Sequence, residues 1–210
     1  MKTKKDDFVE IDFVARVKDT NEIFDLTREE IAKKEKISKR GMTFKPWVVC
    51  LGHGDVLPGL DKGLVDKEVG KEYNFVLKPE EGFGLRSKEL LQLVNTEKFR
   101  KNEVMPVPGM QFNVDNMIGT VKSVSGSRTL IDFNHPLAGK ELVYDVRINK
   151  IIENEEEKVK EFFDFHFHVS VEVEKKEDKL VVKGKIQEPV KKIAKEILER
   201  LLKKKIEYVM

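Results

Sequence analysis

The sequence has a single cysteine, Cys50, among 210 residues. One thiol excludes an intrachain disulfide framework and a zinc site built on paired cysteines, because both need more than one cysteine. Cys50 lies in the apolar run WVVCL, where a free cysteine is usually a small, inert, buried side chain. So low a cysteine count is typical of a reducing compartment.

The sequence also lacks an excess of positive or negative charge, and it lacks long apolar runs. The 40 Lys and Arg residues nearly balance the 38 Asp and Glu residues, which leaves a net charge of +2 and gives no basis for a nucleic-acid partner. No apolar run approaches the ~20 residues that cross a bilayer, and residues 1–7 lack the pattern of a signal peptide. We therefore expect a cytoplasmic protein with no membrane partner.

The common sequence signatures of cofactor and nucleophile chemistry are absent as well. No glycine loop has the form that cradles phosphate, and no Ser or Cys lies in a nucleophile motif, so we expect neither a cofactor nor a metal. His166 and His168 have the spacing to share one face of a strand. Two imidazoles fall short of a usual metal site, so a solvated strand face is the alternative interpretation.

The sequence does carry a clear succession of short elements. Strands are predicted at residues 8–17, 47–51, 73–77 and 142–152, with a charged helical stretch at 27–36 and a helix beginning near Leu60 after a Pro-Gly start signal. Residues 86–130, which we call the insert, differ from the segments around them in the pattern of their predicted elements. They contain the short strands LLQLV, MQFNV and MIGTVKSV, separated by proline, glycine and a helical TEKF, and this predicts a separate small module.

A third unit is predicted after residue 154. Phe163, Phe165, Phe167, Val169, Val171 and Val173 alternate with polar residues. This period of two indicates a half-buried strand, with KLVVKGKI as its hairpin partner. Residues 188–204 have an apolar stripe at helical spacing, so the tail is predicted as β-β-α. The pattern leaves open whether this tail forms a homodimer, binds another partner or only covers the core.

Three segments together resemble the FK506-binding-protein (FKBP) family of prolyl isomerases. They are PWVVCLGHGDVLPGLDKGL, EVGKEYNFVLKPEEGFG and LVYDVRI, and the resemblance covers about residues 8–85 and 132–151. The insert, followed by NHPLAGKEL, is similar to the SlyD-like subgroup with its insert-in-flap domain, in an archaeal-type long form with an extra C-terminal domain. The resemblance implies an α+β fold, with an antiparallel sheet wrapped on a short helix. The domains would be 1–85 with 131–153, the β-rich insert at 86–130, and the tail at 154–210.

The resemblance also implies the residues of the site. The catalytic pocket falls on Phe13, Asp25, Trp47, Val56, Leu57, Leu60, Phe83 and Tyr144, and the loop that closes over it on His135 and Leu137. Leu60 and Phe83 depart from the Trp and Tyr that many members have, so the resemblance implies peptide binding but does not imply high affinity for FK506. In the insert, Met105, Met110, Phe112 and Met117 would bind unfolded polypeptide; the alternative is that they are the core of the module.

The expected function is therefore that of a prolyl isomerase and folding chaperone acting on unfolded or proline-containing polypeptides. One alternative is a holdase that keeps the fold without catalysis. A second alternative is a metal-handling protein, since the SlyD-like subgroup often has a histidine-rich tail. The sequence here ends KKKIEYVM with no histidine, which argues against that alternative.

Overall fold

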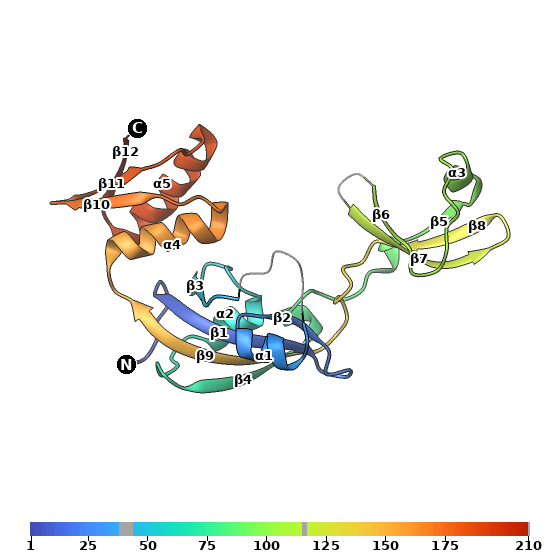
Figure 1. Cartoon of the computed structure of the whole chain (residues 1–210), viewed down its shortest axis with the longest axis horizontal. Coiled ribbons are helices and arrows are strands. Elements are labelled where there is room, and N and C mark those ends of the chain that lie inside the picture. Colours follow the sequence, from blue (N-terminus) through green and yellow to red (C-terminus); the bar gives the residue numbers. More distant parts are fainter. Residues whose placement is uncertain (38–43, 115–116, 210) are drawn as a thin grey trace. The chain divides into compact units, whose positions relative to one another are not determined.

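The computed structural model describes residues 1–37, 44–114 and 117–209. The chain forms two compact units, the first made of Met1–Leu77 with Leu142–Met210 and the second of Lys78–Glu141 (Figure 1). Short helices and mostly antiparallel sheets confirm the predicted α+β class. None of the helices in the described ranges is both long and apolar enough to cross a membrane. The finer division into three domains, with boundaries near 86, 130 and 154, stays a prediction.

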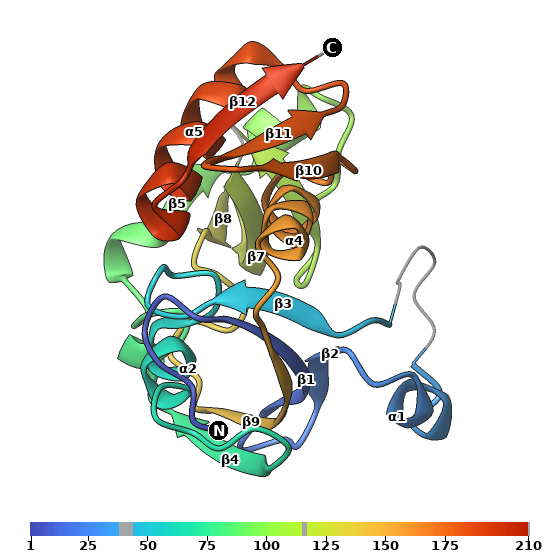
Figure 2. The ribbon, with the colours of Figure 1, turned by 90° about the vertical axis from the view of Figure 1, so that its left-hand side faces the viewer.

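The first unit is built on an antiparallel sheet with β9 (Leu142–Ile152) at its centre. Strand β1 (Phe8–Val17) pairs with β9 along its whole length, and β4 (Glu72–Leu77) pairs with the other edge of β9. The free edge of β1 pairs with β2 (Ile23–Leu26) at one end and with β3 (Trp47–Cys50) at the other. Segments far apart in the sequence thus meet side by side in one curved sheet (Figure 2).

One face of this sheet is apolar because its side chains alternate. In β9, the buried residues Tyr144, Val146 and Ile148 alternate with more exposed neighbours, as the pleat of a strand requires. Helix α1 (Glu29–Lys34) lies in the connection from β2 to β3, and helix α2 (Pro58–Gly63) contacts β4. A Cβ on Gly63 would approach the Phe75 ring of β4 to 2.8 Å, so this glycine allows the close contact between helix and sheet.

The C-terminal segment of the first unit alternates helices and strands. It runs through α4 (Glu155–Phe167), β10 (Glu172–Lys176), β11 (Lys179–Lys183), α5 (Glu188–Leu202) and β12 (Lys205–Val209). Strands β10 and β11 form an antiparallel hairpin, and α5 returns the chain so that β12 pairs in parallel with β11. The predicted β-β-α order is present as β10, β11 and α5, whereas α4 and β12 were not predicted.

The strand predicted from residue 163 is wrong over residues 163–167, which are the last turns of α4. Asn154 caps this helix, accepting a hydrogen bond from the Glu157 backbone N–H at 2.9 Å, and three glutamates follow in the first turn, where negative charge is favourable. Val159, Phe162 and Phe163 are buried at helical spacing, so the period of 3.6 residues prevails over the period of two.

The two histidines consequently do not share a strand face. His166 lies in the last turn of α4, and His168 ends the helix with a φ of 54°. Among the described residues, no group of three or more His, Cys, Asp or Glu side chains could hold a metal ion.

The main sheet and the C-terminal segment share one hydrophobic core. Phe8, Val48, Cys50 and Ile152 of the sheet lie in the same buried cluster as residues of α4, β10, β11, α5 and β12, among them Phe163. Burial raises the pKa of the Cys50 thiol to about 12, which agrees with the inert cysteine expected from the sequence.

The second unit is a small antiparallel sheet with the strand order β5-β8-β7-β6. Its elements are η1 (Pro79–Glu81), η2 (Lys88–Leu90), β5 (Leu91–Asn95), α3 (Glu97–Arg100), β6 (Gln111–Val114), β7 (Met117–Ser125) and β8 (Arg128–Asp132); β8 was not predicted. The carboxylate of Asp132 is buried and pairs with Arg86, and it accepts hydrogen bonds from the backbone N–H and side-chain amide of Asn134. Burial alone would raise the pKa of Asp132, but these donors hold it below its ordinary value.

The shared core predicts that a cavity in α4 destabilises the main sheet. Phe163 is fully buried, so Phe163→Ala should reduce the free energy of unfolding by about 3–5 kcal/mol. Chemical denaturation followed by Trp47 fluorescence and by far-ultraviolet circular dichroism measures this, and both signals should shift together. Val209→Ala, at an exposed position, is the control and should stay within about 0.5 kcal/mol. A Trp47 transition unchanged in Phe163→Ala would contradict the shared core.

Candidate functional site

Five aromatic rings of the first unit form a continuous row that includes Trp47. The Trp47 ring packs edge-on against Phe13, with centroids 4.9 Å apart, and against Phe165, with centroids 5.6 Å apart. Tyr144 lies 5.8 Å from Phe13 and 5.9 Å from Phe24. The structure thus brings the predicted residues Phe13, Trp47 and Tyr144 together. We call these five residues the aromatic cluster.

Strand register places the predicted acid beside this cluster. Ala15 of β1 faces Asp25 of β2 on one edge and Tyr144 of β9 on the other. Burial and, after it, the negative charge of Asp25 raise the pKa of Tyr144. The Asp25 carboxylate accepts a hydrogen bond from the Leu26 backbone N–H at 2.9 Å. A half-buried carboxylate therefore lies within electrostatic reach of an apolar, aromatic surface.

The predicted aliphatic residues lie on the segment that leads into α2. Leu60 is buried within α2, whereas Val56 and Leu57 are half-buried just before it. Asp61 fixes the preceding turn, because its carboxylate accepts hydrogen bonds from the backbone N–H groups of Gly52 at 2.8 Å and Gly54 at 3.1 Å.

Asp55 ties this segment both to β3 and to α4. Its carboxylate accepts a hydrogen bond from the Cys50 backbone N–H at 2.7 Å and lies 3.4 Å from Nε2 of His166. Burial raises the pKa of Asp55. The segment that carries Val56 and Leu57 is therefore held by a contact from α4 as well as by the main sheet.

The remaining predicted pocket residues belong to the second unit. The rings of Phe83 and His135 are stacked, with centroids 4.3 Å apart and planes within 8°. The Leu137 backbone N–H donates to Nδ1 of His135 at 3.2 Å. The predicted site residues thus form one group in each unit.

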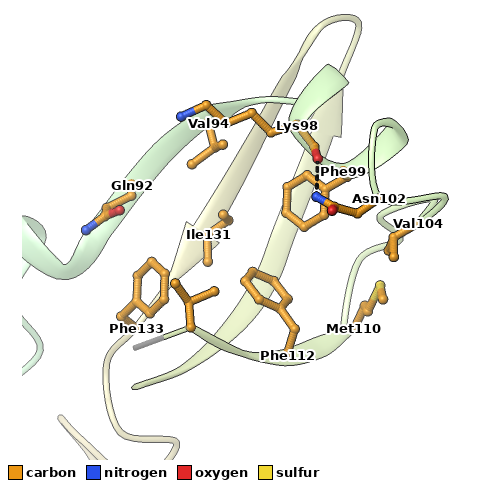
Figure 3. Close-up of a pocket in the computed structure, with 11 residues that line it drawn as sticks. Gln92, Val94, Lys98, Phe99, Asn102, Val104, Met110, Phe112, Ile131 and Phe133 are labelled. Carbon is orange, nitrogen blue, oxygen red and sulfur yellow. Dashed lines mark hydrogen bonds between the residues drawn. The ribbon is translucent and has the colours of Figure 1, made fainter. Parts of the chain in front are cut away.

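The second unit also contains an apolar pocket of about 410 Å³ (Figure 3). Its apolar lining comes mainly from Val94, Phe99, Met110, Phe112, Ile131 and Phe133. The Phe112 ring packs edge-on against Phe99 at 5.4 Å and against Phe133 at 6.5 Å. Of the four residues predicted to bind unfolded chain, Met110 and Phe112 line this pocket.

The other two, Met105 and Met117, lie outside the pocket lining and are 68% and 45% exposed. Such exposure shows that they are not core residues of the module, which was the alternative for this set.

Sequence reasoning missed several residues of both sites. Phe165 was assigned to the inner face of a strand, although the Asn154 cap and the glutamates after it were a readable helix signal. Phe99, Ile131 and Phe133 of the second-unit pocket were not among the residues predicted to bind, although Phe133 directly precedes the NHPLAGKEL segment. Ile131 lies on β8, so its role depended on a strand that was not predicted.

Comparison with known proteins adds two findings. A family model described as "FKBP26, IF domain" matches residues 92–137. The short-type peptidyl-prolyl cis-trans isomerase of Methanocaldococcus jannaschii is 30% identical over 148 residues, which cover 70% of this chain and 93% of that protein.

Two bacterial proteins are similar over a shorter stretch. The FKBP-type peptidyl-prolyl cis-trans isomerase SlyD of Treponema pallidum is 34% identical over 106 residues, 49% of this chain and 60% of that protein. The SlyD protein of Haemophilus influenzae is 35% identical over 108 residues, 50% of this chain and 56% of that protein.

The aromatic cluster predicts that Trp47 reports on peptide binding. Trp47 is the only tryptophan and is half-buried, so a proline ring packed on it should shift or quench its emission. Titration with a short Ala-Pro peptide, against the same peptide with alanine in place of proline, measures this effect. If saturating proline peptide leaves both the emission and the NMR signal of the indole N–H unchanged, the cluster is not the binding site.

Proposed function

This chain belongs to the FKBP-type peptidyl-prolyl cis-trans isomerases of the SlyD-like kind, and we propose that it also acts as a chaperone that captures unfolded polypeptide on its second unit. It is an enzyme that interconverts the cis and trans forms of X-Pro bonds. We propose that the aromatic cluster binds the proline and that the second unit binds other parts of the same client polypeptide.

The observation that carries the proposal is the distribution of exposed apolar side chains. In the second unit the exposed large apolar residues are Leu85, Leu90, Leu91, Leu93, Met105, Val107, Val114, Met117, Ile118 and Val124. Elsewhere in the described chain only Met1, Val76, Ile193 and Val209 are comparably exposed. Apolar exposure gathered on one small unit is typical of an interaction surface.

The chemistry of this surface favours a variable client rather than one fixed ligand. The apolar pocket of the second unit opens among phenylalanine, valine and methionine side chains, and the exposed methionines adapt to partners of different shape. Unfolded polypeptides share exposed apolar side chains and little else, so a pliable apolar surface suits them.

The aromatic cluster supports catalysis by differential binding. The barrier to rotation is ~18–20 kcal/mol because resonance gives the C–N bond partial double-bond character, and unaided X-Pro isomerisation takes tens to hundreds of seconds. The planar amide is more polar than the twisted one, so a dry aromatic surface disfavours the planar ground state relative to the transition state.

Asp25 is the polar residue we assign to this step. Its carboxylate lies at the edge of the cluster, close enough to Tyr144 to affect its pKa. There it would orient the backbone of the substrate or stabilise the dipole of the twisted amide. No proton transfer and no covalent intermediate are needed. We assign Val56, Leu57 and Leu60 to the wall of the proline pocket that the family resemblance implies beside this cluster.

The partners and the location follow from this proposal. The clients are unfolded or proline-containing polypeptides, and a buried free Cys50 suits a cytoplasmic protein. A homodimer through the C-terminal segment stays a prediction. Light scattering of the full chain tests it, because the mass of a monomer would exclude the dimer.

The first test removes apolar exposure from the second unit. A triple variant, Leu93→Gln, Met105→Gln and Ile118→Gln, changes side chains that are 59%, 68% and 59% exposed and should fold normally. Burying an apolar side chain contributes ~1.5–3 kcal/mol when complete, so we expect client binding about tenfold weaker or worse. Suppression of aggregation of a reduced, unfolded protein measures it.

A matched control and a second substrate make this test specific. Ile193→Gln removes an apolar side chain of α5 that is 52% exposed and should leave aggregation suppression intact. The triple variant should lose more activity on proline-limited refolding of a protein than on isomerisation of a tetrapeptide. Equal losses on both substrates would mean that capture and catalysis are not on separate units.

The second test addresses Asp25. Asp25→Ala should reduce kcat/KM on short X-Pro peptides by on the order of tenfold to a hundredfold, while the far-ultraviolet circular dichroism spectrum stays native. Aggregation suppression should fall far less than turnover. Native-like turnover by a folded Asp25→Ala protein would remove Asp25 from the site.

A further inference from the structure

A groove lies beside Trp47. One wall is the segment of Lys45, Pro46, Trp47 and Val48, and the other wall is α4, which contacts β3 (Figure 2). The side chains from α4 are Glu161, Asp164 and Phe165, whose spacing places them along one face of the helix; His168, which ends the helix, also lines the groove. The volume, about 440 Å³, is within the range of pockets that hold small ligands. We call this space the α4 groove.

The α4 groove is continuous with the aromatic cluster. The Trp47 ring packs edge-on against Phe13 and also against Phe165, and it lines the groove itself. An extended chain advances ~3.3–3.6 Å per residue, so a polypeptide with its proline on Trp47 reaches the groove within about two to four residues. The groove is therefore within reach of the residues that flank the proline.

The charges of the groove favour a cationic occupant. Lys45 pairs with Asp164, whereas Glu161 has no ion-pair partner within the described ranges. Burial raises the pKa of Glu161, and the neighbouring carboxylates of Asp164, Glu157 and Glu10 raise it further, against the opposing effect of Lys45. Bringing a positive charge to Glu161 would relieve both the burial cost and this repulsion.

Lys45 lowers the pKa of Glu161 and so meets that need in part, but the lysines around the groove have other carboxylate partners. Lys150 is paired with Glu10 and Glu157, and Lys45 is paired with Asp164. Among the described residues that line the groove, Glu161 is the carboxylate without an ion-pair partner, so the groove carries more negative than positive charge.

We propose that the α4 groove is a substrate subsite for the residues flanking the proline, and that Glu161 selects a lysine or arginine there. This inference rests on the proposed placement of the proline on the aromatic cluster. It makes the C-terminal segment part of substrate recognition and gives the isomerase a preference for basic sequences around its target bond.

The test compares isomerisation of peptides that carry lysine, alanine or glutamate at each position flanking the proline, in a protease-free fluorescence assay. At one position the wild type should turn over the lysine peptide about fivefold to tenfold better than the glutamate peptide, mainly through KM, because a partly buried charge pair adds binding energy in ground and transition states alike. Glu161→Gln should bring this ratio close to one, and Glu161→Lys should invert it.

A carboxylate removed elsewhere controls for net charge. Glu196→Gln lies on an exposed part of α5 and should keep the wild-type ratio. Equal turnover of lysine and glutamate peptides by the wild type, or a ratio that survives in a folded Glu161→Gln protein, overturns the subsite. A separate variant tests whether the proline binds on the aromatic cluster. If it does not, Trp47→Leu would leave turnover of the alanine peptide unchanged.

Discussion

The pairing of β9 with both β1 and β4 is the constraint on which the first unit depends. The ladder from Phe8 opposite Ile152 to Val17 opposite Leu142 joins the beginning of the chain to a segment more than half its length away. The same strand receives β4, where Leu77 faces Leu142. Because these two residues are register partners, the chain leaves the sheet for the second unit and returns from it at neighbouring positions. The sheet can therefore carry a whole unit between two strands without a change of register.

Trp47 is where the main sheet and the C-terminal segment of the first unit touch through aromatic rings. It begins β3, and its ring touches Phe13 of the main sheet on one side and Phe165 of α4 on the other. The His166–Asp55 contact joins the same helix to the segment before α2. A helix that follows the main sheet in the chain thus supports the residues assigned to the proline, and the shared core around Phe163 holds that helix in place.

Much of the first unit was predictable because its signals are local or belong to a specific family pattern. Alternating residues gave the strands, and Pro58 with Gly59 gave the start of α2. The α4 helix was missed because the phenylalanines from 163 to 167 fit a period of two by coincidence, while the buried stripe of Val159, Phe162 and Phe163 follows the helical period. Strand β12 was missed because it is short and pairs in parallel with β11, which lies on the far side of α5 in the chain. Strand β8 was missed although it is the hairpin partner of β7, because the short turn between Ser125 and Arg128 was not recognised. No local pattern could show that Phe165 would reach Trp47, since that contact depends on how α4 packs on β3.

The neighbouring ends of the second unit also have a consequence for the order of events during synthesis. Residues 78–141 are continuous in the chain, and their sheet pairs only with itself, whereas the main sheet lacks its central strand until residues 142–152 have been made. Domains generally fold as units from the N-terminal end as they emerge. Residues 78–141 are therefore complete, with the exposed apolar side chains of their unit, before the main sheet receives its central strand, so the second unit is able to fold earlier than the isomerase unit.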